Sequence, residues 1–185
     1  REIAKGDIVN LGIGLPETVA VVAGEEKRLD DFTLTLESGP IGGIPASGLS
    51  FGCSMNPEAI IDQPSQFDFY DGGGLDIAVL GAVEIDESGS INVTSFGGRF
   101  AGVGGFVNIS QNARRVVFCC TFRAGDLQVE WKDDALKILK EGEHCKFVKR
   151  VAQVGFHGPS ALARGQSVLY VTERAVFRLT PRGLE

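Results

Sequence analysis

Glu37 is the residue whose type and position in this 185-residue sequence point most directly to chemistry. It follows Phe32-Thr33-Leu34-Thr35-Leu36, whose alternating pattern is typical of a half-buried β-strand. The residues after it, Ser38 to Pro45, are rich in Gly and Pro and predict turn and loop. A carboxylate at the end of a strand is held rigidly yet stays accessible, as catalytic groups often are in open α/β sheets. The alternative interpretation is that Glu37 is simply the polar residue that ends the strand.

A first glycine-rich turn could offer backbone N–H groups to an anion. A short strand over Ile8 to Leu11 runs into Gly12-Ile13-Gly14, and Pro16 suits the first position of a helix over about 17–23. N–H groups point outward where a strand, a glycine turn and a helix meet, so an anion or oxyanion can bind there. The turn is not a dinucleotide fingerprint, because Glu17 occupies the third glycine position, and no G-K-[S/T] makes it a P-loop.

A second glycine-rich loop, Gly97 to Phe106, lies near three basic residues, Arg99, Arg114 and Arg115. These side chains could contact phosphates, or they could be ordinary surface charge. The side-chain amide of Asn56 is also in a predicted loop, where such groups bind ligands or cap local turns.

Other catalytic chemistries have weaker support in the sequence. Gly48-Leu49-Ser50-Phe51-Gly52 matches the nucleophile elbow of serine hydrolases, but a poor strand precedes it and only His144 and His157 could complete a triad. Two isolated histidines and four cysteines without a C-x-x-C pair give no metal-ligand spacing. Nothing favours a glycosidase pair among the scattered carboxylates.

The remaining pattern predicts the elements that must position Glu37. A short helix is expected over 57–62, buried strands over 75–83 and 116–122, a hairpin around 87–90, and a terminal hairpin around Glu173-Arg174. The segment 132–141 has a helical composition beside residues that suit strands. Strands and helices mixed with glycine loops indicate an α/β fold with a parallel or mixed central sheet.

Length and composition set the outer bounds. The chain fits one domain, over residues 1–185, and its 43% hydrophobic and 23% charged residues are those of an ordinary soluble globular chain. A net charge of -6 argues against a nucleic-acid binder, and no apolar run is long enough for a membrane span. The cysteines form no disulfide framework, so a reducing cytoplasm is expected. Because the chain begins at Arg1 and its single methionine is Met55, we expect a piece of a longer polypeptide.

Five segments, in order, resemble the class I coenzyme A transferases, specifically their β-type, C-terminal half. They are Leu11-Gly12-Ile13-Gly14-Leu15-Pro16, Glu37-Ser38-Gly39, Gly73-Gly74-Leu75-Asp76 with Leu80-Gly81-Ala82, Gly102-Val103-Gly104-Gly105, and Thr172-Glu173-Arg174-Ala175-Val176-Phe177. The form E-S-G-P-I-G-G is most similar to the single-chain short-chain acyl-CoA transferases for acetate, propionate or acetoacetate. The resemblance implies an open mixed or parallel sheet with flanking helices, the NagB/RpiA-like fold.

The resemblance also implies a mechanism and roles for site residues. Glu37 is the nucleophile and carries a glutamyl-CoA thioester in ping-pong chemistry, without a metal or a permanently bound cofactor. Backbone N–H groups of Ile13 and Gly105 are the expected oxyanion donors, and CoA, as substrate, is expected to contact Gly104, Gly105, Arg99 and Asn56. The alternatives are a non-catalytic module that binds CoA or a sugar phosphate, and a serine hydrolase that uses Ser50.

Partners and setting follow from the same resemblance. The expected substrates are an acyl-CoA and a carboxylic acid, in short-chain fatty acid or ketone-body metabolism. The expected partner is the α-type half of the same enzyme, with assembly into a homo-oligomer. Without that half, we expect the chain to expose an apolar face.

Overall fold

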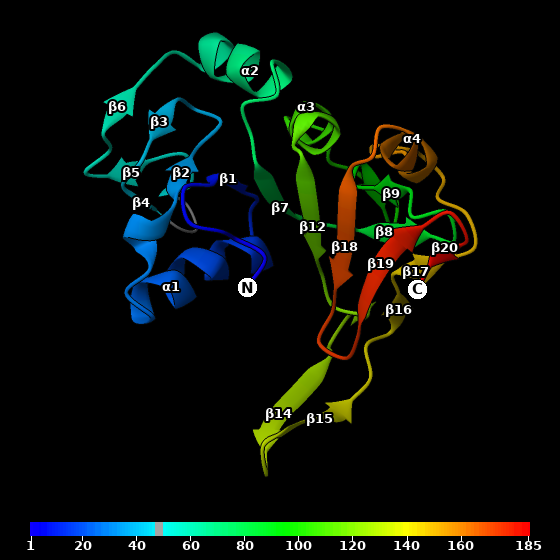
Figure 1. Cartoon of the computed structure of the whole chain (residues 1–185). Coiled ribbons are helices and arrows are strands. Elements are labelled where there is room, and N and C mark those ends of the chain that lie inside the picture. Colours follow the sequence, from blue (N-terminus) through cyan, green and yellow to red (C-terminus); the bar gives the residue numbers. More distant parts are fainter. Residues whose placement is uncertain (47–49) are drawn as a thin grey trace.

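The computed structural model describes residues 1–46 and 50–185, and its main feature is a nine-stranded sheet (Figure 1). The strand order across the sheet is β20-β19-β18-β12-β7-β1-β2-β3-β6. In chain order these strands are β1 (Ile8–Leu11), β2 (Thr33–Thr35), β3 (Pro40–Ile41), β6 (Ala59–Ile60), β7 (Ile77–Gly81), β12 (Arg115–Cys119), β18 (Ser167–Val171), β19 (Val176–Thr180) and β20 (Gly183–Leu184).

The centre of the sheet is parallel and its two margins are antiparallel. Strands β18, β12, β7, β1 and β2 pair with one another in parallel. The margins β19–β20 and β3–β6 run antiparallel to their neighbours. The sequence-based prediction of an α/β fold with an open mixed sheet is therefore confirmed. Because the parallel strands all end at one edge, the segments after β1, β2, β7 and β12 are brought together there.

Helices cover both faces of the sheet, and each face has its own apolar core. The helices are α1 (Thr18–Glu25), α2 (Gln63–Asp71), α3 (Phe106–Asn112) and α4 (Gly158–Ala163), with 3-10 turns at Leu15–Glu17 and Leu29–Asp31. Along β7, Ala78 and Leu80 join a cluster with residues of α2, α3 and α4, whereas Ile77 and Val79 join a cluster with residues of α1. This alternation explains why β7 is a continuous apolar run in the sequence.

Short strand pairs extend the loops around the sheet. They are β4 (Ile44–Pro45) with β5 (Ser54–Met55), β8 (Glu84–Asp86) with β9 (Ile91–Asn92) and β17 (Phe147–Val148), β10 (Ser95–Phe96) with β11 (Arg99–Phe100), and β13 (Arg123–Ala124) with β16 (His144–Cys145). The predicted hairpins around 87–90 and around Glu173-Arg174 are confirmed as β8–β9 and β18–β19.

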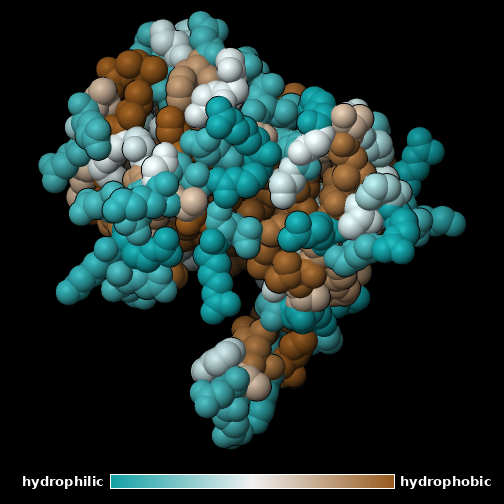
Figure 2. Space-filling view, in the orientation of Figure 1, coloured by the Kyte–Doolittle hydropathy of each residue, from teal (hydrophilic) through white to brown (hydrophobic). Residues whose placement is uncertain are grey.

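One hairpin projects from the body as an arm, which consists of β14 (Gln128–Lys132) and β15 (Ala135–Lys140) (Figure 1). Val129 pairs with Ile138 and Trp131 with Leu136, so these four apolar side chains share one face. Trp131 is 68% exposed, and Figure 2 shows apolar surface along the arm. The segment 132–141, which the sequence left open between helix and strand, is therefore mostly strand.

The predicted helix over 57–62 is wrong. Residues Ala59–Ile60 form strand β6, which pairs with β3, and the helix begins only at Gln63. Asp62 explains the shift, because its carboxylate accepts hydrogen bonds from the N–H and the hydroxyl of Ser65 and so caps α2. Residues Phe67 to Tyr70 therefore lie on a helix beside Glu37, although the sequence predicted neither a helix nor a strand for them.

Two further features concern only the part of the chain that is described. None of its helices has the length and apolar character needed to cross a membrane. It also contains no group of three or more His, Cys, Asp and Glu side chains placed to hold a metal ion.

Candidate active site

Glu37 lies in a tight turn just beyond β2, at the edge where the parallel strands end. The Gly39 N–H donates to the Leu36 carbonyl (3.0 Å), and the Leu36 N–H donates to the Pro40 carbonyl (3.0 Å). Gly39 has a φ of 119°, and a Cβ there would lie 1.9 Å from the Ile61 carbonyl oxygen. Only glycine fits this position, so the backbone that carries Glu37 is closely confined.

The Glu37 carboxylate meets the second glycine loop. A Cβ on Gly105 would lie 3.0 Å from Glu37 Oε2 and 2.8 Å from Cζ of Phe67 on α2. Ile13, in the first glycine turn, lines the same cavity as Glu37 and Gly105. The structure thus brings together the three residues that the sequence proposed as nucleophile and oxyanion donors.

Backbone N–H groups are available at both glycine loops. Within the described residues, neither the Ile13 N–H nor the Gly105 N–H has a hydrogen-bond acceptor, while the neighbouring Gly12 N–H donates to the Val79 carbonyl. Unpaired donors beside a cavity can bind an incoming anion or a developing oxyanion. Gly104 has a φ of 52°, a left-handed conformation that favours glycine and turns the chain into α3.

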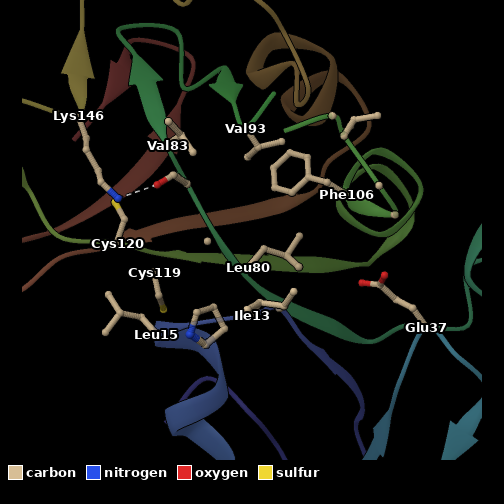
Figure 3. A pocket seen from close by; sticks show the side chains of 18 of the residues that line it. Ile13, Leu15, Glu37, Leu80, Val83, Val93, Phe106, Cys119, Cys120 and Lys146 are labelled. Carbon is tan, nitrogen blue, oxygen red and sulfur yellow. Dashed lines mark hydrogen bonds between the residues drawn. The ribbon is translucent and has the colours of Figure 1, made fainter. Parts of the chain in front are cut away.

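A cavity of about 540 Å³ opens at this edge of the sheet (Figure 3). Its volume lies within the range of about 300–1,000 Å³ that ligand pockets commonly have. Glu37 lies at one end and Lys146 at the other, with Ile13 and Leu80 between them in this view (Figure 3). The walls are largely apolar, with Leu15, Val83 and Val93 among them.

Lys146 is the cation among the described residues that line this cavity. Its ammonium group donates to the Ala82 carbonyl (2.9 Å), and no carboxylate of the described residues lies within ion-pair distance of it. An ammonium group has three donors, so Lys146 retains capacity for an anionic ligand.

The two cysteines of the cavity are poor competitors for the role of nucleophile. Burial, with a smaller contribution from neighbouring Cys120, raises the pKa of the Cys119 thiol to about 11. Burial also raises the pKa of the Cys120 thiol, although the Lys146 charge partly opposes this effect. Both thiols therefore stay protonated at neutral pH, and a protonated thiol is a weak nucleophile.

The Glu37 carboxyl is ionisable and has no ion-pair partner in the described part of the chain. It is half-buried, and burial raises its pKa above the usual range. Partial desolvation makes a carboxylate more basic and more reactive toward a carbonyl carbon. The Glu37 carboxylate, at one end of the cavity, can therefore act as a nucleophile.

Other residues proposed from the sequence lie elsewhere. Arg99, on β11, and Asn56, which has a φ of 52°, are exposed and are not among the described residues that line the cavity. In the elbow motif, Gly48 and Leu49 lie outside the described residues, whereas Ser50 is exposed. The Nδ1 of His157 lies 2.7 Å from Ser160 Oγ, which is a local contact at the start of α4.

Sequence reasoning missed Lys146 and Phe67 as site residues. Lys146 follows His144-Cys145 in a segment that showed no ligand pattern, and it reaches the cavity only because β17 pairs with β8. Phe67 sits on the helix that was misplaced. The Asp62-x-x-Ser65 cap was the local signal that could have placed this helix correctly.

An α/β chain with a carboxylate, unpaired N–H groups and a cavity at one sheet edge has the arrangement of an acyl-transfer site. No family model matches the chain. It is 46% identical over 183 residues to acetate CoA-transferase YdiF of Escherichia coli K12, covering 99% of this chain and 34% of that protein. It is 50% identical over 183 residues to caffeate CoA-transferase of Acetobacterium woodii, covering 96% of this chain and 35% of that protein.

A shorter relative has nearly the extent of this chain. The chain is 31% identical over 188 residues to the beta subunit of an acetate CoA-transferase of Escherichia coli K12, covering 96% of this chain and 76% of that relative. The chain therefore belongs to the class I CoA-transferase family, and it aligns with the β-type part. It spans about a third of the length of the two longer relatives.

A solved structure supports the same assignment. The acyl-CoA transferase YdiF of E. coli O157:H7, in a thioester complex with CoA, superposes with a TM-score of 0.93 at 45% identity. The superposition covers 99% of this chain and 34% of that one. The fold expected from the family resemblance is thus confirmed.

Proposed function

We propose that the protein to which this chain belongs transfers CoA between an acyl-CoA and a carboxylic acid, with Glu37 as the nucleophile. The observation that carries the proposal is the position of the Glu37 carboxylate, without an ion-pair partner among the described residues, 3.0 Å from the Cβ position of Gly105 at the cavity head. The names acetate and caffeate CoA-transferase, and the CoA thioester of the YdiF complex, support the same reaction class.

The first half of the reaction moves CoA onto Glu37. A carboxylate oxygen attacks the thioester carbonyl carbon, the carbon–sulfur bond breaks, and an acyl-glutamyl anhydride and CoA thiolate form. The thiolate then attacks the glutamyl carbonyl carbon, giving a glutamyl-CoA thioester and releasing the first acid as its carboxylate. A second carboxylate reverses both steps, which regenerates Glu37 and yields the new acyl-CoA.

Each attack forms a tetrahedral intermediate whose oxygen becomes negatively charged. We assign the N–H groups of Ile13 and Gly105 to this oxyanion, since both lack acceptors among the described residues and border the cavity with Glu37. Fixed donors of this kind typically contribute about 3–4 kcal/mol each to transition-state stabilisation. Because Glu37 is an anion at neutral pH, the mechanism needs no partner base.

Lys146 is our candidate for contact with a phosphate of CoA. It stands at the opposite end of the cavity from Glu37 and has two ammonium donors left beyond its bond to Ala82. Arg99 and Asn56, proposed from the sequence for CoA, would have to contact parts of CoA that extend past the cavity, whereas Gly104 and Gly105 line it.

The Lys146 assignment predicts a result that depends on the substrate. We expect Lys146→Met to raise KM for acyl-CoA about tenfold and to leave KM for the phosphate-free acyl-pantetheine thioester unchanged, since only CoA offers phosphates. Lys149→Met, which removes an exposed lysine nearby, serves as the control. Equal losses with both thioesters would show that Lys146 does not contact phosphate.

The proposal also covers the partner of this chain and the cellular compartment of the enzyme. One relative is named as the beta subunit of a CoA-transferase, which supports an α-type partner. We propose that this α-type part closes the acyl pocket and that the enzyme assembles into a homo-oligomer. Four free cysteines fit a reducing compartment, so we propose a cytoplasmic enzyme of short-chain fatty acid or ketone-body metabolism. We also propose that residues 1–185 form a single β-type domain.

Substitution of Glu37 tests the function. We expect Glu37→Gln in the full-length protein to lower CoA transfer about a thousandfold or more, because an amide cannot serve as the nucleophile. Glu25→Gln, on the exposed face of α1, is the matched control and should transfer normally. A Glu37→Gln variant with full transfer activity would refute the assignment, and intact CoA binding without transfer in the wild type would indicate a binding module.

A further inference from the structure

Helix α2 contacts the strand that leads to Glu37 through a buried polar network. The Tyr70 hydroxyl donates to Thr35 Oγ1 (3.1 Å) and accepts from Gln66 Nε2 (2.8 Å) and Asn10 Nδ2 (3.5 Å). Thr35 Oγ1 in turn donates to the Val9 carbonyl (3.1 Å). Tyr70 and Gln66 are fully buried, so this network fixes the end of β2 against β1 and α2.

This network lies at the strand end next to the turn that carries Glu37. Thr35 is the last residue of β2 and precedes Glu37 by two residues, so the network holds the strand end from which the Glu37 turn begins. Burial raises the pKa of Tyr70, and the charge of Glu37 raises it further, while the hydrogen bonds from its neighbours lower it. Phe67 of the same helix and the Glu37 carboxylate both lie against Gly105.

The C-terminal end of α2 contacts the other half of the site. The Asp71 carboxylate accepts two hydrogen bonds from Asn108 Nδ2 (3.0 Å each) and one from Asn112 Nδ2 (3.1 Å). Both asparagines belong to α3, which begins directly after Gly105. Phe67 lies about one turn earlier in α2, with its ring 5.6 Å from the Tyr70 ring and its Cζ beside the Gly105 backbone.

We propose that α2 is the positioning element of this site: Tyr70 holds the strand end that carries Glu37, and Asp71 holds the helix that begins at Gly105. Together they set the separation between the nucleophile and the Gly105 oxyanion donor. The inference rests on the proposed function of Glu37. A displacement of about 1 Å at reacting groups can lower a rate about a hundredfold, so a brace of this kind acts on kcat.

Two matched tyrosine variants test the first contact in the full-length protein. We expect Tyr70→Phe to lower kcat about tenfold while KM for acyl-CoA changes less than about twofold, because binding does not require the carboxylate to be aligned. Tyr170→Phe is the control, because Tyr170 is equally buried and its hydroxyl donates to the Gly89 carbonyl instead. Equal kcat values for the two variants would overturn the inference.

Two substitutions of exposed Asp71 test the second contact without disturbing the core. Asp71→Ala removes the acceptor for Asn108 and Asn112, and we expect kcat to fall about fivefold at unchanged KM. Asp71→Asn keeps a side-chain carbonyl that can accept from α3, so it should recover most of that loss. An Asp71→Ala variant with wild-type kcat would overturn the assignment.

A trapping measurement separates this inference from the proposed function. Each variant is mixed with acyl-CoA, the thioester is reduced with borohydride at set times, and the modified peptide is quantified. If the wild type carries no modification at Glu37, the proposed function fails. If the wild type is modified and Tyr70→Phe is modified at the same rate, only the positioning role of α2 fails.

Discussion

At the scale of single residues, the burial of Glu37 determines the pH at which the site works. Burial raises the pKa of this carboxyl, and only its ionised form can attack a thioester. We therefore expect the rate of thioester formation from acyl-CoA to fall with decreasing pH, with a midpoint above the value of about 4.3 for an exposed glutamate. A stopped-flow pH profile of this half-reaction checks the prediction, and a midpoint at or below that value would contradict it.

The same shift gives an independent check through stability. A carboxyl whose pKa is raised in the folded state destabilises that state when it is ionised. The loss of folding stability is therefore present at neutral pH, and it vanishes below the pKa that the carboxyl has in the unfolded chain. Glu37→Gln should therefore have a higher melting temperature than the wild type at pH 7. At a pH below about 4, where the unfolded carboxyl is also protonated, the two should melt alike.

Local patterns single out several residues that the structure places at the cavity, and the family resemblance supplies the roles proposed for them. Glu37 ends a strand pattern, and Ile13 and Gly105 lie in glycine loops, so each has a visible local context. Lys146 has no such context, since it reaches the cavity through the pairing of β17 with β8. Tertiary pairing of this kind is absent from a local pattern, which is why Lys146 was missed.

At the scale of elements, the close approach of α2 to the start of α3 shapes the site. Gly105 has a φ of -78°, which alanine can adopt, so its need for glycine comes from space alone. We expect Gly105→Ala to lower kcat about tenfold or more, because its Cβ would meet Phe67 Cζ at 2.8 Å and Glu37 Oε2 at 3.0 Å. Steady-state kinetics of the full-length protein measure this effect.

Gly24→Ala, within α1, is the matched control for that substitution. Its Cβ would meet only Leu29 Cδ1, at an ordinary contact distance of 3.6 Å, and alanine favours a helix over glycine by about 1 kcal/mol. This variant should keep its activity and become slightly more stable. The spatial argument fails if Gly105→Ala behaves in the same way.

Strands with a strongly periodic or continuous apolar pattern could be predicted from the sequence. A helix whose first residue is set by a capping side chain could not. Strand β1 was predicted with its observed bounds, and β7 and β12 were predicted with ends shifted by a few residues. The helix was expected over 57–62, whereas the Asp62 cap sets the start of α2 at Gln63. Residues Ala59–Ile60 form a strand because they pair with β3, and local strand propensity does not decide it.

At the scale of the whole molecule, the β14–β15 arm projects from the body and carries exposed apolar side chains (Figure 1). An isolated two-stranded hairpin is marginally stable in water, and this one exposes Val129, Trp131 and Leu139. Such an apolar projection is typical of a contact surface. We propose that the α-type part of the full-length enzyme covers it.

Trp131 is the single tryptophan of the chain and reports directly on this contact. In the isolated chain we expect its fluorescence to have the emission of an exposed indole and to be quenched readily by acrylamide, since the side chain is 68% exposed. In the full-length protein, the spectrum lost on Trp131→Phe substitution should be blue-shifted and protected. A Trp131 signal that is equally exposed in both would contradict the packing.

The measurement that tests the central claim most directly is the location of the covalent intermediate. The full-length enzyme is incubated with acyl-CoA without an acceptor acid, reduced with borohydride, digested and mapped by mass spectrometry. The mechanism predicts reduction of the Glu37 side chain to the alcohol, dependent on acyl-CoA and absent in Glu37→Gln. An unmodified Glu37 under full CoA occupancy, or an acyl group on Ser50, would contradict it.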